Sequence, residues 1–201
     1  MQNGWGTMEL RVGLDGRPKC GWCAGDALYE AYHDDEWGVP LRDDRPLFGL
    51  LMLEGFQAGL AWITILRKRK HFDKAFDGWD PGAIAVYGPD DIARLMADPG
   101  IVRNRLKVEG AVKNANAWLR LQTEVGSFSD YLWGFVGGQP MVMRPASSDD
   151  FRATSPESDA MSKDFKKRGF TFVGSTICYA FMQSAGMVDD HMVGCWRTAQ
   201  S

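Results

Sequence analysis

The sequence predicts an all-α protein, and three observations support this class. Strand-like alternation is scarce, amphipathic stretches of helical length are present, and caps, glycines and prolines divide the chain into helix-sized pieces. The chain has 201 residues, 45% of them hydrophobic, which fits one globular domain. Residues 1–18 are rich in glycine and lack periodicity, so we expect a flexible extension followed by a domain over residues 19–201.

The first expected helix covers residues 26–37 and ends before Pro40. The next opens at Pro46, because proline is tolerated near the first turn, and Asp43 or Asp44 caps it. This helix enters a long apolar stretch that a glycine-containing segment later interrupts.

Further helices are expected at residues 62–76, 89–96, 102–123, 158–169 and 175–185, with short ones near Asp80 and after Ser127 or Ser129. Proline and glycine pairs separate them, as in the tight turn over residues 98–100 and the stop at Gly169. Residues 141–154 are polar and irregular, and we expect a loop that crosses the molecule.

The composition restricts the class of protein. The net charge of -3 argues against a broadly basic nucleic-acid-binding protein, so any DNA contact has to be local. Residues 1–19 lack the apolar core of a secretory signal, so we expect a cytoplasmic location, where cysteines bind metal or stay free. Residues 47–66 have the length of a membrane span, but Glu54, Gln57 and three glycines inside them argue against a membrane segment.

Glu54 is the one carboxylate in the apolar stretch over residues 47–66. In a helix, Leu50, Leu51 and Ala58 share its face, so the acid has apolar neighbours. Burial of a lone carboxylate costs free energy, so the group has to be paired, protonated or used in binding or catalysis. Glu54 is therefore a candidate functional residue.

Large aromatic residues flank Glu54 in the first third of the sequence: Trp22, Tyr29, Tyr32, Trp37 and Trp62. Tyr29 and Tyr32 are three positions apart and share a helix face. Rings around a carboxylate suit a flat, electron-poor or cationic ligand. Core packing explains any single ring equally well, but the full set together with the acid favours a ligand pocket.

Four residues near the chain ends form two candidate metal-binding pairs. Cys20 precedes His33 by thirteen positions, and His191 precedes Cys195 by four. Together they can supply the Cys2His2 set of a structural zinc site that joins the N- and C-terminal segments. Cys23 forms a C-x-x-C with Cys20 and competes as a ligand. Unrelated residues are an open alternative, because the spacing is not that of a compact zinc finger.

The turn at Gly100 is a candidate DNA-binding feature, because a helix precedes it and Arg103 and Arg105 follow it. Backbone N–H groups at the start of the second helix can hold a phosphate without reading sequence. Residues 101–122 contain five basic residues and one acidic residue, so the positive charge is local. An ordinary solvated helix face is the alternative interpretation.

Longer blocks of sequence resemble one family. They are Cys20-Gly-Trp22, Tyr29-Glu-Ala-Tyr32-His33-Asp-Asp-Glu-Trp37-Gly-Val-Pro40, Leu53-Glu54-Gly-Phe-Gln57-Ala-Gly-Leu-Ala-Trp62-Ile, Lys167-Arg-Gly-Phe-Thr-Phe-Val-Gly-Ser-Thr-Ile-Cys178-Tyr and Asp190-His191-Met-Val-Gly-Cys195. These blocks closely resemble the bacterial 3-methyladenine DNA glycosylase I (Tag-type) family. The resemblance covers roughly residues 19–196 and implies the all-α helix–hairpin–helix DNA glycosylase fold, with its hairpin at residues 95–108.

The resemblance also implies residue roles. The family's zinc ligands fall on Cys20, His33, His191 and Cys195. Its pocket acid falls on Glu54 and its pocket aromatics on Trp22, Tyr29, Tyr32, Trp37 and Trp62. Gly59 and Leu60 match the short plug that enters the DNA stack beside a flipped nucleotide.

The function implied is that of a monofunctional enzyme that excises 3-methyladenine from alkylated double-stranded DNA and releases the free base, and a monomer is the default expectation. Methylation at N3 makes adenine cationic, so the N-glycosidic bond is weak and a strong general acid is unnecessary. We expect Glu54 to accept hydrogen bonds from the flipped base, and its charge to favour the cationic lesion. Two alternatives stay open: a damage-binding module without catalysis, and a redox protein that uses Cys20 and Cys23.

Overall fold

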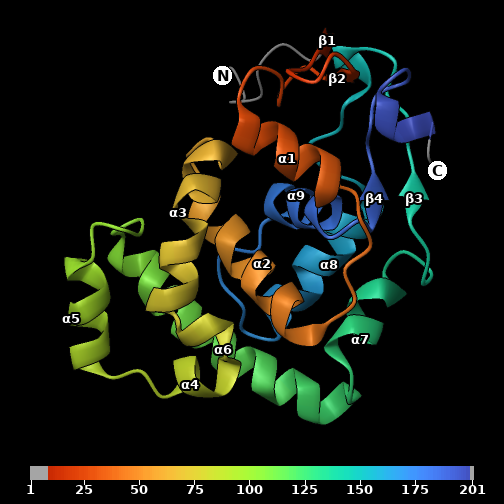
Figure 1. Cartoon of the computed structure of the whole chain (residues 1–201). Coiled ribbons are helices and arrows are strands. Elements are labelled where there is room, and N and C mark those ends of the chain that lie inside the picture. Colours follow the sequence, from red (N-terminus) through yellow and green to blue (C-terminus); the bar gives the residue numbers. More distant parts are fainter. Residues whose placement is uncertain (1–8, 200–201) are drawn as a thin grey trace.

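The computed structural model describes residues 9–199, and this part of the chain is mostly helical, which confirms the expected class. The helices are α1 (Ala27–Asp35), α2 (Asp44–Gln57), α3 (Trp62–Ala75), α4 (Pro81–Ala85), α5 (Pro89–Ala97), α6 (Arg105–Val125), α7 (Phe128–Gly134), α8 (Pro156–Lys167) and α9 (Ser175–Ser184). Figure 1 shows α2 at the centre, with the other helices arranged around it. None of the helices in residues 9–199 combines the length and apolarity needed to cross a bilayer.

Helix α2 forms the centre of the core because most of its side chains are apolar. From Leu47 to Phe56, every residue except Leu50 is buried. Gly49 allows close packing against the next layer, since a Cβ atom there would lie 2.7 Å from the ring of Trp79. The position of Glu54 in the middle of this helix therefore fixes it inside the protein.

The start of α2 differs from the expected capping. Asp43 occupies the cap position, but its side chain makes no capping hydrogen bond. The Asp44 carboxylate is used at another helix instead, because it accepts hydrogen bonds from the backbone N–H groups of Phe128 and Ser129 at the start of α7. The short helix expected near Asp80 begins at Pro81, and the Asp80 side chain caps it. Of the two expected caps Ser127 and Ser129, Ser127 is the one whose side chain accepts a backbone N–H at the start of α7.

Helices α5 and α6 are joined by a turn that packs tightly on α3. The Asp98 carboxylate accepts a hydrogen bond of 2.6 Å from the backbone N–H of Gly100. A Cβ atom on Gly100 would lie 2.8 Å from the His71 ring, so the turn requires glycine. Helix α6 begins at Arg105 rather than near residue 102, because the Asn104 side chain caps it by accepting from Lys107 N–H.

Residues 10–20 form a hairpin, so the expected loose extension is wrong for residues 10–18. Strand β1 (Leu10–Val12) pairs with β2 (Pro18–Cys20) in an antiparallel sheet. Lys19 anchors the hairpin, since its buried ammonium group forms ion pairs with Asp15, Glu30 and Asp34. Residues 1–8 of the expected extension lie outside the described residues.

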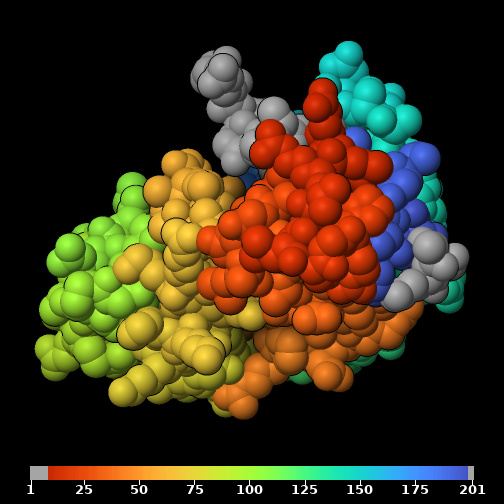
Figure 2. Space-filling view, turned by 45° about the horizontal axis from the view of Figure 1, so that its top comes forward, coloured from red at the N-terminus to blue at the C-terminus, as the bar shows by residue number. Residues whose placement is uncertain are grey.

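The loop over residues 141–154 reaches the C-terminal segment. Within it, β3 (Met141–Val142) pairs in parallel with β4 (Val188–Asp189). Figure 2 shows the N-terminal segment, in red, lying against the blue C-terminal segment. The short helices η1 (Asp77–Trp79), η2 (Ser148–Asp150) and η3 (Trp196–Ala199) complete the described fold. Residues from the two ends of the sequence therefore meet beside α1.

Candidate active site

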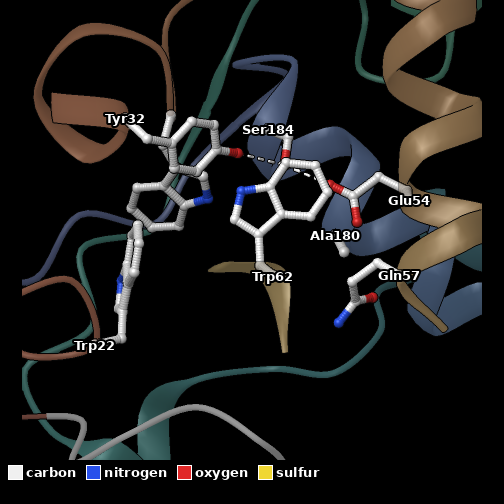
Figure 3. Close-up of a pocket in the computed structure, with 8 residues that line it drawn as sticks. Trp22, Tyr32, Glu54, Gln57, Trp62, Ala180 and Ser184 are labelled. Carbon is white, nitrogen blue, oxygen red and sulfur yellow. Dashed lines mark hydrogen bonds between the residues drawn. The ribbon is translucent and has the colours of Figure 1, made fainter. Parts of the chain in front are cut away.

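A cavity opens beside Glu54, between α1, α2, α3 and α9 (Figure 3). The space inside it that a water-sized molecule can occupy is about 20 Å³, and the cavity is open to solvent. Its walls are mainly aromatic, with few polar groups, as in many small-molecule sites. The lining residues are Trp22, Tyr32, Trp37, Glu54, Gln57, Trp62, Ala180 and Ser184.

Glu54 is the acidic group of this cavity, and its side chain is only 2% exposed. The Ser184 hydroxyl donates a hydrogen bond of 2.7 Å to Glu54 Oε1, and the Tyr32 hydroxyl donates one of 3.0 Å to Ser184. Burial raises the pKa of Glu54 to about 7, although the bond from Ser184 opposes this rise. The acid therefore changes charge near neutral pH.

Four of the five predicted aromatic residues line the cavity. Trp22 and Trp37 pack edge to face with ring centroids 5.0 Å apart, and Tyr32 lies 5.5 Å from Trp62. Tyr29 does not line the cavity but packs against Trp22 at 4.9 Å. The Nε1 atom of Trp62 is buried, and no atom of the described residues accepts its hydrogen.

Three lining residues were missed by sequence reasoning: Gln57, Ala180 and Ser184. Gln57 lies three positions after Glu54 on α2, so helical spacing would have placed it near the acid. Ala180 and Ser184 lie on α9, some 130 positions along the chain from Glu54. No sequence signal marks Ser184, because its role depends on how α9 packs against α2.

Three of the four predicted metal ligands form a buried cluster. The candidate ligand atoms of Cys20, His33 and Cys195 all lie within 4.8 Å of one another. A hydrogen bond from the Cys20 thiol lowers the pKa of the Cys195 thiol against the effect of burial, and His33 adds to the lowering. A thiolate beside a second thiol and an imidazole is a donor set that can hold a metal ion.

His191, the fourth predicted ligand, lies next to this cluster. Its ring centroid is 4.9 Å from that of His33. Its Nδ1 atom lies 2.8 Å from a carboxylate oxygen of Asp189, while its Nε2 atom is buried without a hydrogen-bond partner among the described residues. Cys23 is not part of the cluster and donates instead to the Cys20 carbonyl at 3.1 Å.

The predicted plug residues lie in the short loop between α2 and α3. Gly59 has a φ of 84°, a backbone conformation that favours glycine, and Leu60 is 38% exposed. The loop is held from two sides: Gln57 Nε2 donates to the Leu60 carbonyl at 2.7 Å, and Lys107 Nζ donates to the Ala58 carbonyl at 2.6 Å. The loop thus presents an apolar side chain at a fixed position next to the cavity residue Gln57.

The predicted backbone-binding residues lie around the turn before α6. Arg103 and Arg105 are exposed, and Arg105 is 3.5 Å from the Glu109 carboxylate. Lys107, on the first turn of α6, reaches the loop that contains Gly59 and Leu60. The structure therefore connects the turn containing Gly100 with the loop beside the cavity.

The described residues thus form a helical fold that buries an acid among flat rings, beside an exposed apolar loop. The sequence model for methyladenine glycosylase matches residues 22–198. The chain therefore belongs to the methyladenine glycosylase family, and the family expected from the sequence is confirmed.

The similarity to known relatives extends over nearly nine tenths of this chain. It is 47% identical to DNA-3-methyladenine glycosylase 1 of Escherichia coli (strain K12), over 88% of this chain and 95% of that protein. A crystal structure of 3-methyladenine DNA glycosylase I superposes with a TM-score of 0.86, at 49% identity, covering 89% of this chain and 98% of that one. A structure that describes 3-methyladenine recognition by the Staphylococcus aureus enzyme also has a TM-score of 0.86, at 38% identity and with coverage of 89% and 95%.

Proposed function

We propose that this protein is a monofunctional DNA glycosylase that excises 3-methyladenine from alkylated double-stranded DNA. The observation that carries the proposal is the buried Glu54 carboxylate in a cavity walled by Trp22, Tyr32 and Trp62. The relatives that this chain matches carry the same activity in their names, which supports the proposal.

Glu54 has the chemistry to select a cationic base. Methylation at N3 places a positive charge on adenine, so a nearby carboxylate attracts the lesion more than neutral adenine. The attraction is stronger in a cavity with a low dielectric constant than in water. Glu54 accepts hydrogen bonds from the edge of the flipped base, and its charge must be present when the base binds.

The aromatic rings give the base a place to stack. Trp22, Tyr32, Trp37 and Trp62 line the cavity, and Tyr29 packs against Trp22. Bond breaking yields the neutral base and an oxocarbenium-like sugar, which water captures. Because the cationic base is already a good leaving group, the pocket has to orient and hold it rather than protonate it. Among the described residues, those that line the cavity include no lysine to act as a nucleophile, in agreement with base release without strand cleavage.

DNA is held outside the cavity by two elements, the loop between α2 and α3 and the helix–hairpin–helix formed by α5, the turn at Gly100 and α6. Leu60, with Gly59 beside it, fills the space in the stack from which the base has rotated. The turn at Gly100, with Arg103 and Arg105, binds the phosphate backbone as a phosphate-positioning contact. One copy of the chain carries all of these elements, so we propose that the monomer is the active form.

A zinc ion bound by Cys20, His33, His191 and Cys195 completes the proposed enzyme. The orphaned Nε2 atom of His191 supports the fit, because a buried imidazole nitrogen without a partner among the described residues suits a metal ligand. Asp34 and Asp189 contact the Nδ1 atoms of the two histidines and hold their orientation. With four protein ligands the zinc would have a structural role, joining the two ends of the chain.

Excision from methylated DNA tests the proposal. The wild-type protein is incubated with N-methylated DNA, and the released bases are separated and quantified. Glu54→Gln should lower the rate of 3-methyladenine release by about 100-fold or more, which is the usual effect of removing an electrostatic interaction at a reacting group. The matched control is Glu124→Gln, which removes an exposed carboxylate outside the cavity and should retain the wild-type rate. Absence of base release by the wild-type protein, with DNA binding retained, would instead identify a damage-binding module.

A further inference from the structure

A serine hydroxyl separates the pocket acid from the nearest phenol. Three helices contribute the chain of contacts: Tyr32 on α1 donates to Ser184 on α9 at 3.0 Å, and Ser184 donates to Glu54 on α2 at 2.7 Å. Figure 3 shows the two hydrogen bonds meeting at the Ser184 hydroxyl, between Tyr32 and Glu54. The Tyr32 ring is only 3% exposed, and Glu54 is deeply buried, so this polar chain lies in an apolar environment.

The direction of these hydrogen bonds follows from the chemistry of the groups. A serine hydroxyl has one hydrogen and two lone pairs, so when it donates to Glu54 it can only accept from Tyr32. The Tyr32 phenol has one hydrogen, which it donates to the Ser184 hydroxyl. Each bond polarises the next towards the carboxylate.

We propose that Ser184 is a positioning residue: its hydroxyl, oriented by Tyr32, fixes the Glu54 carboxylate and stabilises it in the anionic form that a cationic base requires. The inference rests on the role of Glu54 proposed above. The bond occupies Oε1, so the other carboxylate oxygen remains for the base edge.

None of the neighbouring groups named below stabilises the Glu54 carboxylate by opposite charge, so the Ser184 hydroxyl is left as its stabilising contact. From α1, the titratable groups near the acid are Tyr29 and Tyr32, both of which remain neutral. From α3 and α9, the groups that line the cavity with it are uncharged. From α6, the ammonium group of Lys107 is bound to the carbonyls of Phe56 and Ala58. Burial therefore opposes ionisation of Glu54, and the Ser184 hydroxyl is the group that favours it.

The first test is the pH dependence of kcat/KM for excision of 3-methyladenine from methylated DNA. Ser184→Ala should move the midpoint of the profile up by about one pH unit and lower kcat/KM at pH 7 by about fivefold to tenfold, as loss of a hydrogen bond to a charged group predicts. At pH 9 its rate should return to near the wild-type value. Ser184→Thr keeps the hydroxyl and should restore the wild-type profile. A loss that is equal at every pH would overturn the inference, because it indicates only a packing defect.

The second test reads the carboxylate directly and does not depend on activity. The carboxyl carbon of Glu54 is titrated by NMR in the ¹³C-labelled wild-type protein and in Ser184→Ala, with Glu54→Gln used to assign the signal. Titration about one pH unit higher in Ser184→Ala supports the inference, and an unchanged titration refutes it. Ser175→Ala, at the other end of the same helix, should leave the titration unaltered. Should Glu54→Gln excise at the wild-type rate, the proposed role of Glu54 fails, while the titration still decides what Ser184 does.

Discussion

The cavity and the cysteine–histidine cluster are two buried polar centres that share an aromatic wall. Trp37 lines the cavity, and its ring centroid lies 4.7 Å from that of His191. Trp22 lines the cavity and lies 5.4 Å from the His33 ring. Residues from both ends of the chain build both centres, yet the centres differ in how their polar groups are satisfied.

In the cluster, each histidine has a fixed carboxylate partner. Asp34 contacts His33 at 2.7 Å, and Asp189 contacts His191 at 2.8 Å. In the cavity, the Glu54 carboxylate has a neutral serine as its partner. The comparison teaches that carboxylates hold the imidazole rings of the first centre in fixed orientations, whereas in the second centre a single neutral hydroxyl contacts the acid and leaves its other oxygen available.

The largest expected effect is a loss of stability when the cysteine–histidine cluster is disrupted. Cys20→Ser, or treatment with a strong chelator, should lower the thermal unfolding midpoint by more than about 10 °C, because a structural zinc ion contributes on the order of 10 kcal/mol to folding in small domains. Circular dichroism and metal analysis measure the two quantities. Cys23→Ser is the matched control, since Cys23 lies outside the cluster, and it should keep the metal. Equal unfolding midpoints with and without metal would show that zinc does not stabilise the fold.

The next prediction concerns how Glu54, the acid of the cavity, makes the stability of the protein depend on pH. Glu54 has a pKa of about 7 in the folded protein against an ordinary value of 4.5, so the folded state binds more protons between these values. The free energy of unfolding should therefore fall by about 3 kcal/mol as the pH rises from 4.5 to above 7. In Glu54→Gln this decline should disappear, leaving a variant that is more stable at pH 8 and less active. Urea unfolding at several pH values measures the effect, and parallel curves for the two proteins would contradict it.

The aromatic wall of the cavity gives an intermediate effect. Trp62→Ala should lower excision about 10-fold to 100-fold, because stacking of a base on an aromatic ring contributes about 1–3 kcal/mol. Trp79→Phe is a useful comparison, since Trp79 packs in the core away from the cavity and its replacement should reduce stability rather than excision. Single-turnover kinetics and thermal unfolding separate the two results. Unchanged excision by Trp62→Ala would show that the ring is not a stacking surface.

The smallest effect concerns the DNA backbone. Arg105→Gln should weaken binding to any duplex and reduce the dependence of log K on log salt concentration by about 0.9, since one phosphate is no longer neutralised by the protein. Fluorescence anisotropy at several salt concentrations measures both values. The control is Arg45→Gln, which removes an exposed arginine paired with Asp80 at the far end of α2. If both variants have the wild-type slope, Arg105 does not bind a phosphate.

The sequence was sufficient for some features of the two centres and insufficient for others. The helical class and the burial of Glu54 were expected, because helical periodicity is a local signal. The proximity of Cys20, His33 and Cys195 was implied by the family resemblance, whereas their spacing alone left unrelated residues as an open alternative. The hairpin over residues 10–20 was not expected, although Asp15-Gly16 is a common turn pair. Its stability depends on the ion pairs that Lys19 makes with residues of α1, which spacing does not reveal.

Ser184 was beyond the reach of the sequence for the same physical reason. A serine near the end of a helix is common, and only the packing of α9 on α2 brings its hydroxyl to the Glu54 carboxylate. Asp44 gives a second example, because its carboxylate holds the start of α7 rather than capping its own helix. Contacts between distant segments therefore decide how the polar groups of this protein are used.

The central claim is that ionised Glu54 selects the cationic base, and the pH profile of kcat/KM for 3-methyladenine excision by wild-type protein and Glu54→Gln tests it most directly. This parameter reports groups of the free enzyme. For the wild type, kcat/KM should rise through a midpoint near pH 7, and the variant should be about 100-fold slower at pH 8 with no such rise. Equal rates for the two proteins at pH 8, or a wild-type profile without a midpoint in this range, would contradict the account.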